Sequence, residues 1–589
     1  MDRLFKRSNF AKVNYLNKMW DFVIDPENKG TEEKWFDNFP EGSRKMIVPS
    51  CWNSEIDLFR YTGTAWYQTT FETTSSNIYI NFEAVQNEAD VYLDGKHLGN
   101  HYGGFLQFGY EVNNLAPGTH ALTVRVNNSL NDTDSFPLSL VDWFNYGGIA
   151  RGVYIRELGE SWIKDYKISY DLENSLKDVN LHVQADIKTF SEKTEDFEIY
   201  VNDEKIYSSN ISISGEKQIT ADIKLESIKL WGIYKPELYL IRLVYGNEDI
   251  IERIGFREIK TIGKDLLLNG EKIKILGVNR HEEHPDFGFS MPFNLIKKDI
   301  DIVRNLNGNA IRTSHYPNSH KTADYCDEIG MLFWSEIPAW NRKVEPMSNP
   351  LAVSRALSME EEMIKEHFHH PSIIFWGMHN ECATDTPEGY EVTEKMVKLA
   401  KSLDSSRLIT YASNKVKPDT NREMCFALAD VVSVNHYIGW YFPVENGDWN
   451  DFLEEYKDVL KSCDSYDKPF LFTEFGYAAL PGFNTFESSR WSEDYQADAL
   501  EFTLNQILNH EHVSGGYIWQ MCDARSDQDF EISRPRGCNN KGILDPYRKP
   551  KRAYRTVQKI YGEHLGIDLP HYETHIYRYT KNSKMEKKF

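Results

Sequence analysis

Two glutamates in this sequence each follow a short apolar run, and that placement could support chemistry. Residues 373–376 are apolar, and the polar residues His379, Asn380 and Glu381 follow shortly after them. Residues 468–476 have the same design, with a proline, an apolar run and then Glu474 before a glycine. Such runs are typical of strands buried on both faces. In barrels of parallel strands the carboxyl ends of the strands carry the chemistry, so both glutamates are candidate catalytic residues.

Two carboxyl groups at strand ends are the arrangement that cleavage of a glycosidic bond requires. One must be protonated to release the leaving group, and the other must be ionised to attack or to activate water. We expect Glu381 to be the acid, because the apolar strand before it raises its pKa, and Glu474 to be the ionised nucleophile beside Tyr437. A separation of about 5 to 5.5 Å would mean retention, and about 6.5 to 9.5 Å inversion. Alone, Asn380-Glu381 could instead cap the next helix.

The chain that positions these residues is too long for a single domain. A chain of 589 residues predicts two to four domains, and 41% hydrophobic with 13% aromatic residues is ample for packed cores. The formal net charge of −22 argues against nucleic acid and anionic membranes as partners, since both need a basic face. An anionic ligand must therefore be held by cations placed close to it.

The seven cysteines are odd in number, scattered and without C-x-x-C spacing. This pattern predicts reduced thiols of a cytosolic protein and neither a disulfide framework nor a zinc site. No apolar segment follows the charged N-terminus, and no later segment reaches the ~20 apolar residues of a membrane span. We therefore expect a cytoplasmic protein with no membrane partner.

The periodicity of the chain predicts two β-sandwiches. From 1 to 160, half-buried strands at 78–82, 89–93 and 121–126 alternate in period two, with Asp94-Gly95 as a hairpin turn. This favours a jelly-roll-like sandwich in which Trp52, Trp66, Tyr67 and Trp143 are core or inter-domain aromatics. From 161 to 256, strands at 181–187 and 238–244 predict a smaller, Ig-like sandwich.

From 257 to 565 strands alternate with helices, which predicts a (β/α)₈ barrel carrying the catalytic residues. Helices are expected at 294–306, 352–369, 391–402 and 492–509, and residues 566–589 form a charged tail. The eight expected strands are 273–278, 310–313, 331–334, 373–377, 408–411, 431–435, 470–474 and 515–519.

Polar residues accumulate just after most of these strands. Such a ring of polar groups predicts a pocket that surrounds a polyhydroxylated ligand, with Trp519 offering an apolar face to a sugar ring. The groups are Asn279-Arg280-His281-Glu282, Ser314-His315-Tyr316, Asn380-Glu381, Asn435-His436-Tyr437 with Tyr441, Glu474, and Trp519 with Asp523 and Arg525.

These residues belong to stretches that resemble glycoside hydrolase family 2. Residues 309–317 (N-A-I-R-T-S-H-Y-P) and 376–381 (W-G-M-H-N-E) are similar to its two signatures, and 473–476 (T-E-F-G) to its nucleophile strand. Residues 66–68 and 145–149 extend the similarity into the first sandwich. The resemblance implies a sandwich, an Ig-like domain and a barrel with retaining chemistry, in which Glu381 is the acid/base and Glu474 the nucleophile.

Within that family, residues 539–542 (N-N-K-G) resemble the Asn-x-Lys motif of the β-glucuronidases, which grips the C6 carboxylate of the sugar. A buried ammonium without its anion is costly, so Lys541 would favour a uronic acid over a neutral sugar by on the order of 2 to 5 kcal/mol. The motif could also be an ordinary polar turn. The resemblance implies sugar contacts from Asp142, which would reach over from the first sandwich, and from His315, Asn380, Asn435, Tyr437, Tyr441, Trp519, Asn539 and Lys541.

Four features depart from the family pattern. Residues 367–372 read H-F-H-H-P-S where Asp-basic-Asn-His-Pro-Ser is usual, which should change packing more than catalysis. Residues 519–523 read W-Q-M-C-D in place of Trp-Asn-Phe-Ala-Asp, next to the leaving group. The arginine expected before Asn-x-Lys is Arg534 or Arg536, and we place Arg536 among the substrate contacts. Residues 339–355 are short where some gut-bacterial relatives have a long loop, which predicts an open entrance.

The resemblance implies a retaining, exo-acting hydrolase of β-D-glucuronides that needs no cofactor and forms a tetramer or dimer. Some gut-bacterial relatives bind flavin mononucleotide at a remote site, which no Gly-rich loop here supports or excludes. His281-Glu282-Glu283-His284 and the histidines at 367, 369 and 370 lack the H-E-x-x-H order, so we expect no metal. A β-galactosidase or β-galacturonidase specificity stays open, as does a non-catalytic carbohydrate-binding role.

Overall fold

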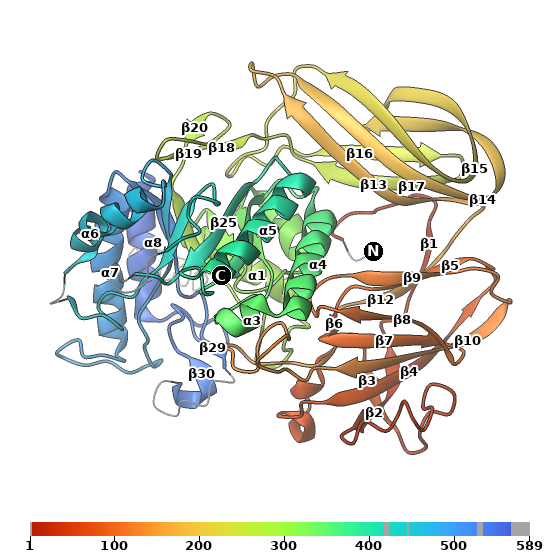
Figure 1. Cartoon of the computed structure of the whole chain (residues 1–589), viewed down its shortest axis with the longest axis horizontal. Coiled ribbons are helices and arrows are strands. Elements are labelled where there is room, and N and C mark those ends of the chain that lie inside the picture. The colour runs from red at the N-terminus through yellow and green to blue at the C-terminus, as the bar shows by residue number, and fades with distance from the viewer. Residues whose placement is uncertain (1–2, 417–422, 445–446, 527–533, 567–589) are drawn as a thin grey trace, which may run out of the picture.

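The computed structural model describes residues 3–416, 423–444, 447–526 and 534–566, which form two β-sandwiches and a barrel (Figure 1). The barrel, coloured green to blue, occupies one side of the molecule. The first sandwich, red to orange, and the second, yellow, lie beside it at its two ends. The expected multidomain class is confirmed, while the expected tail, apart from Gly566, falls outside the described residues.

The first sandwich packs two antiparallel sheets around one apolar core. Its predicted strands and the hairpin turn are present, and both turn residues, Asp94 and Gly95, have positive φ, as a two-residue hairpin requires. The smaller sheet has the order β1 (Lys12–Tyr15), β12 (Val153–Glu157), β5 (Ile78–Phe82) and β9 (Phe108–Val112). The larger has the order β3 (Arg44–Ile47), β2 (Met19–Asp25), β4 (Thr64–Thr73), β10 (Gly118–Asn127), β7 (Glu88–Leu93) and β8 (Lys96–Tyr102). The short strands β6 (Val85–Gln86) and β11 (Gly148–Ile149) pair with each other.

The second sandwich consists of five antiparallel strands around its own core. Two of them are long and bend at register shifts, so that each contributes to both halves of the domain. The strands are β13 (Ser161–Leu172), β14 (Val179–Val201), β15 (Glu204–Leu225), β16 (Tyr239–Tyr245) and β17 (Glu248–Ile254).

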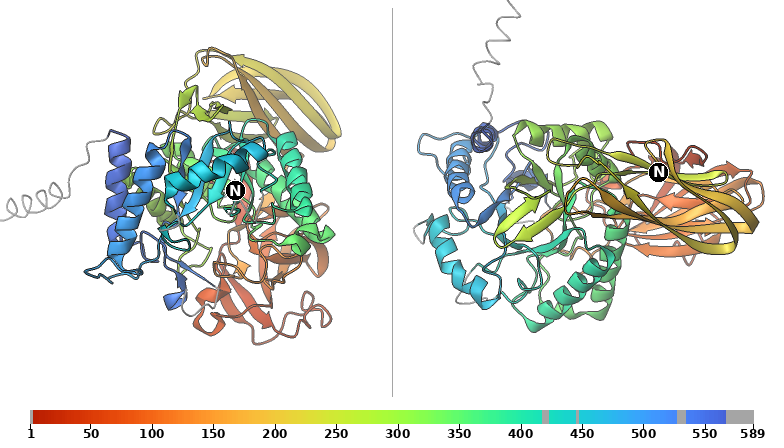
Figure 2. Two further views of the ribbon diagram at one scale, coloured as in Figure 1. Left: turned by 60° about the vertical axis from the view of Figure 1, so that its left-hand side comes forward. Right: turned by 90° about the horizontal axis from the view of Figure 1, so that it is seen from above.

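Eight parallel strands close the barrel, and they correspond to the eight predicted apolar segments. Every residue of these strands is buried, because the core fills the inside and helices cover the outside, as the ring seen from above in Figure 2 shows. The strands are β21 (Ile275–Asn279), β22 (Ala310–Arg312), β23 (Leu332–Glu336), β24 (Ile373–Asn380), β25 (Leu408–Ser413), β26 (Val432–Asn435), β27 (Phe470–Phe475) and β28 (Val513–Ile518).

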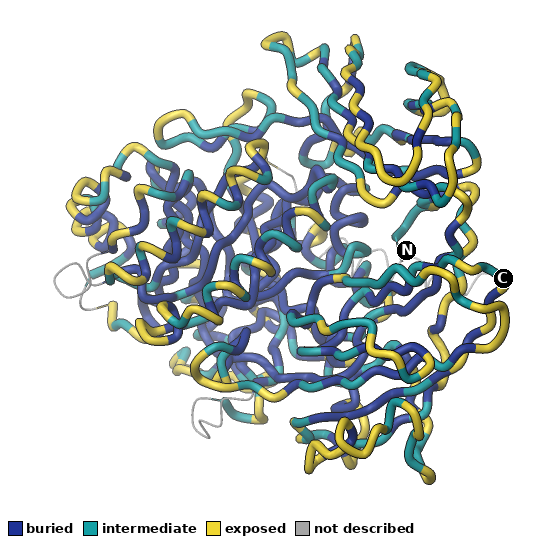
Figure 3. Tube along the Cα trace, turned by 45° about the vertical axis from the view of Figure 1, so that its right-hand side comes forward, coloured by how far each residue is buried: buried dark blue, intermediate teal, exposed yellow. Residues whose placement is uncertain are grey.

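The outer helices alternate buried and exposed residues along their length, as Figure 3 shows in blue and yellow. The helices α4 and α5 begin earlier than predicted, because a side chain caps a proline-led first turn: Asn349 caps α4, and Thr386 caps α5. The helices are α1 (Phe293–Asn305), α2 (His320–Ile329), α3 (Val344–Ser348), α4 (Pro350–His367), α5 (Pro387–Leu403), α6 (Trp449–Ser462), α7 (Glu493–Asn509) and α8 (Arg552–His564). Within the described residues, no helix has the length and apolar character that crossing a membrane would take.

The two ends of the barrel differ in character. A small sheet packs its Leu266 and Leu268 against Trp334, Phe375 and Tyr517, and so closes the amino end with apolar contacts. The carboxyl end carries the polar residues described below. This sheet consists of β18 (Ile259–Ile262), β19 (Asp265–Leu268) and β20 (Glu271–Lys272), while β29 (Ala524–Arg525) and β30 (Cys538–Asn539) pair beyond the last barrel strand.

Candidate active site

Both candidate glutamates lie at the carboxyl end of the barrel. Glu381 directly follows β24, and Glu474 lies in β27. Asn435, which ends β26, pairs with Glu474 in the sheet and donates from Nδ2 to Glu381 Oε1 at 2.9 Å. Glu381 has a left-handed φ of 55° and is held there by its N–H, which donates to Ala412 O at 2.8 Å. The fold therefore brings both carboxyl groups to the same end of the barrel.

Glu474 accepts strong hydrogen bonds on both oxygens. Arg312 Nη1 donates to its Oε1 at 2.9 Å, and Tyr437 OH donates to its Oε2 at 2.7 Å. The residue is only 4% exposed. Because an arginine and a hydroxyl both favour the ionised form, these contacts suit a carboxylate nucleophile.

Arg312 is the hub of the buried polar network and is fully buried itself. Its Nε and Nη2 donate to the two oxygens of Glu336 at 3.0 and 2.9 Å. Nη1 also donates to Asn279 Oδ1 at 3.0 Å, and Nη2 to Asn380 Oδ1 at 2.8 Å. A guanidinium held by this many partners has one orientation, so it fixes the position of Glu474.

His315 lies beside this network in neutral form. Burial lowers its pKa to about 4, although its Nδ1 lies 2.7 Å from Glu336 Oε1. Since Nδ1–H donates to that carboxylate, Nε2 carries a lone pair, 3.8 Å from Glu474 Oε1. Trp519 stacks on the imidazole at a centroid distance of 5.2 Å, and Trp143 of the first sandwich contacts it at 5.6 Å.

Burial raises the pKa of both catalytic candidates. For Glu474, burial raises the pKa to about 8. The positive charge of Arg312 opposes this rise, and the negative charge of Glu381 adds to it. Two buried carboxyl groups that influence each other in this way titrate as a pair. Glu474 accepts from a charged donor and Glu381 from the neutral Asn435, so the last proton of the pair belongs on Glu381.

Lys541 places a positive charge near the two glutamates, beside Tyr441 and Tyr437. Its side chain is buried, and Nζ donates to Tyr441 OH at 2.8 Å. The ring centroids of Tyr441 and Tyr437 lie 4.9 and 5.5 Å from Nζ. No carboxylate of the described residues comes within 4.0 Å of this ammonium group. Tyr437 thus contacts both Glu474 and Lys541, which links the two parts of the site.

Asp142 reaches the barrel from the first sandwich, where it was expected. Its carboxylate accepts from Asn539 Nδ2 at 2.6 Å and from Arg534 at 2.7 and 2.6 Å. Arg536 instead donates to Asp523 at 2.7 Å and to Asn540 at 2.6 Å, with 42% of its side chain exposed. Of the two arginines, Arg534 meets Asp142 and through it Asn539, whereas Arg536 contacts Asn540 and Asp523. The substrate contact expected of Arg536 stays a prediction, and this geometry favours Arg534.

Sequence reasoning gave no role to two residues that organise the site. Arg312 lies inside the stretch quoted for the family resemblance, and Glu336 ends β23, so the strand-end rule that selected Glu381 also applies to it. Conversely, Asp523 follows a strand but binds Lys551 at 2.7 Å and Arg536, and so belongs to a structural ion-pair cluster.

Comparison with family models covers nearly the whole chain. Residues 258–564 match the model described as "Glycosyl hydrolases family 2, TIM barrel domain". Residues 13–158 match the family 2 sugar binding domain, and residues 162–257 match the model "Glycosyl hydrolases family 2". The chain belongs to glycoside hydrolase family 2. The expected fold class and the expectation of a glycoside hydrolase are confirmed.

Two solved structures are similar to this chain over nearly their full length. A β-galacturonidase from Eisenbergiella tayi bound to galacturonate has a TM-score of 0.88 and 35% identity, covering 96% of this chain and 99% of that one. A β-glucuronidase from Ruminococcus gnavus in complex with D-glucuronic acid has a TM-score of 0.83 and 27% identity, covering 95% and 99%. A β-glucuronidase from Paenibacillus borealis is 26% identical over 603 residues, covering 95% of this chain and 98% of that protein.

Proposed function

We propose that this family 2 enzyme is a retaining exo-β-D-glucuronidase. The observation that carries the proposal is Lys541, a buried ammonium group with no carboxylate partner among the described residues. Next to it, the backbone N–H of Lys541 donates to the side chain of Asn539 at 3.2 Å, which orients that amide. A buried cation without its anion is costly, so the substrate is expected to bring one, and a uronic acid does so at C6.

The two glutamates would act by double displacement. Glu474 attacks the anomeric carbon while Glu381 gives its proton to the glycosidic oxygen, which forms a glycosyl ester and releases the aglycone. Glu381, now ionised, takes a proton from water, and the resulting hydroxide equivalent displaces Glu474 to give the free sugar. Both acid–base and nucleophilic roles are filled by side chains, so the reaction needs no cofactor.

Asn380 is suited to hold the sugar close to the reacting carbon. Its Oδ1 accepts from Arg312 and from Asn435, which fixes the amide plane. Its Nδ2 is buried and has no hydrogen-bond partner among the described residues. A buried N–H without a partner, next to Glu381, is a ready donor to a sugar hydroxyl.

A β-D-galacturonide is the second candidate substrate. The identity of this chain is higher to the galacturonidase of Eisenbergiella tayi, at 35%, than to the glucuronidase of Ruminococcus gnavus, at 27%. The two sugars differ only in the configuration at C4, so the charge of Lys541 would serve the carboxylate of either one.

The test is kcat/KM on the p-nitrophenyl β-glycosides of glucuronic acid, galacturonic acid, glucose and galactose. A kcat/KM on the glucuronide about a hundredfold higher than on the neutral glycosides, equal to about 2.7 kcal/mol, supports the proposal. Lys541→Ala should remove most of that preference, whereas Lys549→Ala, at an exposed lysine of the same loop, should not. An equal loss on uronides and neutral sugars in Lys541→Ala would contradict the carboxylate grip, and faster turnover of the galacturonide would decide for the second candidate.

A further inference from the structure

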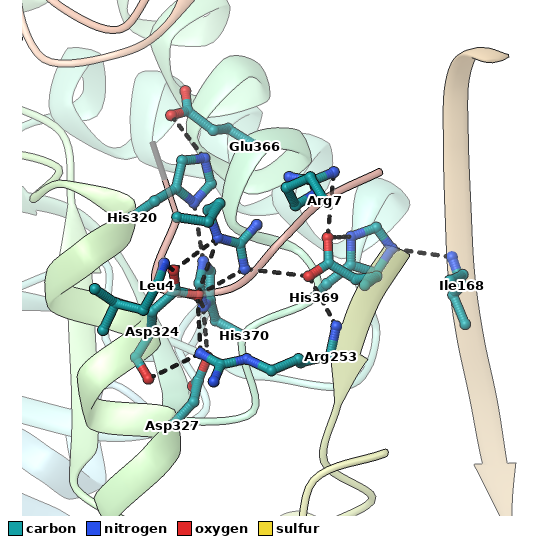
Figure 4. A network of polar contacts seen from close by, with 12 residues as sticks. Leu4, Arg7, Ile168, Arg253, His320, Asp324, Asp327, Glu366, His369 and His370 are labelled. Carbon is teal, nitrogen blue, oxygen red and sulfur yellow. Dashed lines mark hydrogen bonds and ion pairs between the residues drawn. The ribbon is translucent and has the colours of Figure 1, made fainter. Parts of the chain in front are cut away.

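A second group of chemistry-bearing side chains lies between α2 and α4, apart from the two glutamates. His320 is the first residue of α2, and Glu366 and His367 are the last two residues of α4. Each offers one ligand atom, and these atoms all lie within 4.8 Å of one another. Figure 4 shows His320 between Glu366 and His370, with dashed lines to both.

A chain of hydrogen bonds sets the tautomer of His320. His370 Nδ1 lies 2.6 Å from Asp327 Oδ2, and His370 Nε2 lies 3.0 Å from His320 Nδ1. When the Nδ1–H of His370 donates to Asp327, its Nε2 can accept the Nδ1–H of His320. The Nε2 of His320 then carries a lone pair that faces Glu366 Oε1 at 3.2 Å. A cation placed between these two atoms, either a proton or a metal ion, would join them.

His367 lacks a partner in the same place. It is fully buried, and neither ring nitrogen has a hydrogen-bond partner among the described residues. Its Nε2 lies 3.8 Å from Glu366 Oε1, the oxygen that also faces His320. The two imidazoles each offer one ring nitrogen as a ligand atom beside this oxygen. A buried imidazole without any partner is costly, and a metal ion would satisfy it.

The spacing fits a small tetrahedral ion. Zinc bonds of about 2.0 to 2.2 Å to nitrogen and oxygen place neighbouring ligand atoms about 3.3 Å apart. The separations from Glu366 Oε1 to the two Nε2 atoms, 3.2 and 3.8 Å, are close to this value. Two imidazoles and one carboxylate suit zinc better than magnesium or calcium, which prefer oxygen ligands alone.

The site has access to solvent and little competition from neighbouring cations. His320 and Glu366 line a cavity of about 600 Å³ between the first sandwich and the barrel, which leaves room for a water ligand. The nearest arginines are engaged elsewhere. Arg3 pairs with Asp324 at 2.8 Å, and Arg151 pairs with Glu282 at 3.2 Å.

We propose that His320, Glu366 and His367 bind one divalent transition-metal ion, zinc by preference, with water as the fourth ligand. The ion ties α2 to α4, and Asp327 and His370 act as the outer partners that orient His320. This replaces our expectation of no metal at these histidines. That expectation relied on ligands close together in sequence, whereas here one ligand comes from another helix.

The first test measures metal in the full-length chain without an affinity tag. The protein is stripped of metal with a chelator, incubated with zinc chloride and freed of unbound zinc. We then expect about one zinc ion per chain by inductively coupled plasma mass spectrometry. Zinc should raise the melting temperature of the stripped protein by about 3 °C or more. Cobalt(II) should give the visible absorption of a tetrahedral ion, which a merely structural histidine cluster would not produce.

The second test uses variants with a matched control on the same helix. Glu366→Gln and the double variant His320→Gln/His367→Gln should lose the bound zinc, the cobalt spectrum and the melting shift. Glu362→Gln, one turn earlier on α4 where the carboxylate contacts His101, should keep all three. The glycosidase activity of Glu366→Gln should stay within about twofold, since the cluster does not touch the substrate pocket.

One outcome overturns the proposal without any variant. If the wild-type chain takes up less than about a tenth of an equivalent of zinc and its melting temperature does not change, the group holds a proton instead. That proton would lie between Glu366 Oε1 and His320 Nε2, which are 3.2 Å apart.

Discussion

Arg312 Nη1 donates a 2.9 Å hydrogen bond to Glu474 Oε1, while the rest of the same guanidinium grips Glu336 through both carboxylate oxygens. All three groups are buried, so this ion pair is screened little by water. The proposed nucleophile is therefore positioned by a residue of another strand, three positions away around the barrel, and not by its own neighbours in sequence.

Replacing Arg312 by lysine should reduce kcat/KM by about 10² to 10³, because an ammonium group cannot hold Glu474, Glu336 and Asn380 together. Arg257→Lys is the control, since Arg257 is buried at the other end of the barrel and binds Pro371 O and Ile373 O. Steady-state kinetics with a melting curve for each variant separate catalysis from folding. Wild-type kcat/KM in a folded Arg312→Lys protein would contradict the positioning role.

The pH profile of kcat/KM should be bell-shaped, with its alkaline limb above the ordinary pKa range of a glutamate. Burial raises the pKa of Glu381, which keeps the proton of the pair and gives it to the leaving group. Because this pKa is raised, the active form is present below it and is lost as the pH rises through it. For a dinitrophenyl leaving group, which needs no acid, the alkaline limb of glycosylation should flatten; an unchanged limb would assign it to another residue.

The two glutamates should respond differently to replacement by alanine. Glu381→Ala should lose about 10² to 10⁴ in kcat on poor leaving groups but much less on dinitrophenyl uronide, since only the acid is missing. Glu474→Ala should lose about 10⁴ or more on both. Azide should rescue each variant, giving the β-azide with Glu381→Ala and the α-azide with Glu474→Ala. The opposite azide products would exchange the two roles.

Removing Arg534 should damage the pocket, and removing Arg536 should not. Arg534 neutralises Asp142, which in turn holds Asn539, so Arg534→Ala should reduce kcat/KM on the preferred uronide by at least about tenfold. Arg536→Ala should stay within about threefold, because its side chain is partly exposed and Asp523 keeps Lys551. The two variants are each other's control, and equal effects would contradict the assignment.

Local pattern was enough to predict the barrel and to select the two candidate glutamates. The strands are buried on both faces, so each is a continuous apolar run that ends sharply at Glu381, Glu474 or another polar residue. The hairpin at Asp94-Gly95 was predictable for the same reason, since its backbone conformation depends on two adjacent residues. Because the candidate residues follow directly after predicted strands, the candidate site was limited to a few positions.

The choice between Arg534 and Arg536 could not be made from the sequence. The two residues are two positions apart and equally suited to a carboxylate, but only one faces Asp142, which lies 392 positions earlier in the chain. The zinc ligands proposed here show the same limit, because His320 meets Glu366 and His367 only where the fold brings the start of α2 to the end of α4.

The sequence by itself determined the element order, the two glutamates and the candidate lysine, since hydrophobic period and residue type act over a few neighbouring residues. Only the tertiary structure decided which buried charges meet: Arg312 with Glu474 and Glu336, and Arg534 with Asp142. The physical reason is that charge pairing falls off within a few ångströms, while the residues that pair are separated by up to hundreds of positions and are joined by the packing of the domains.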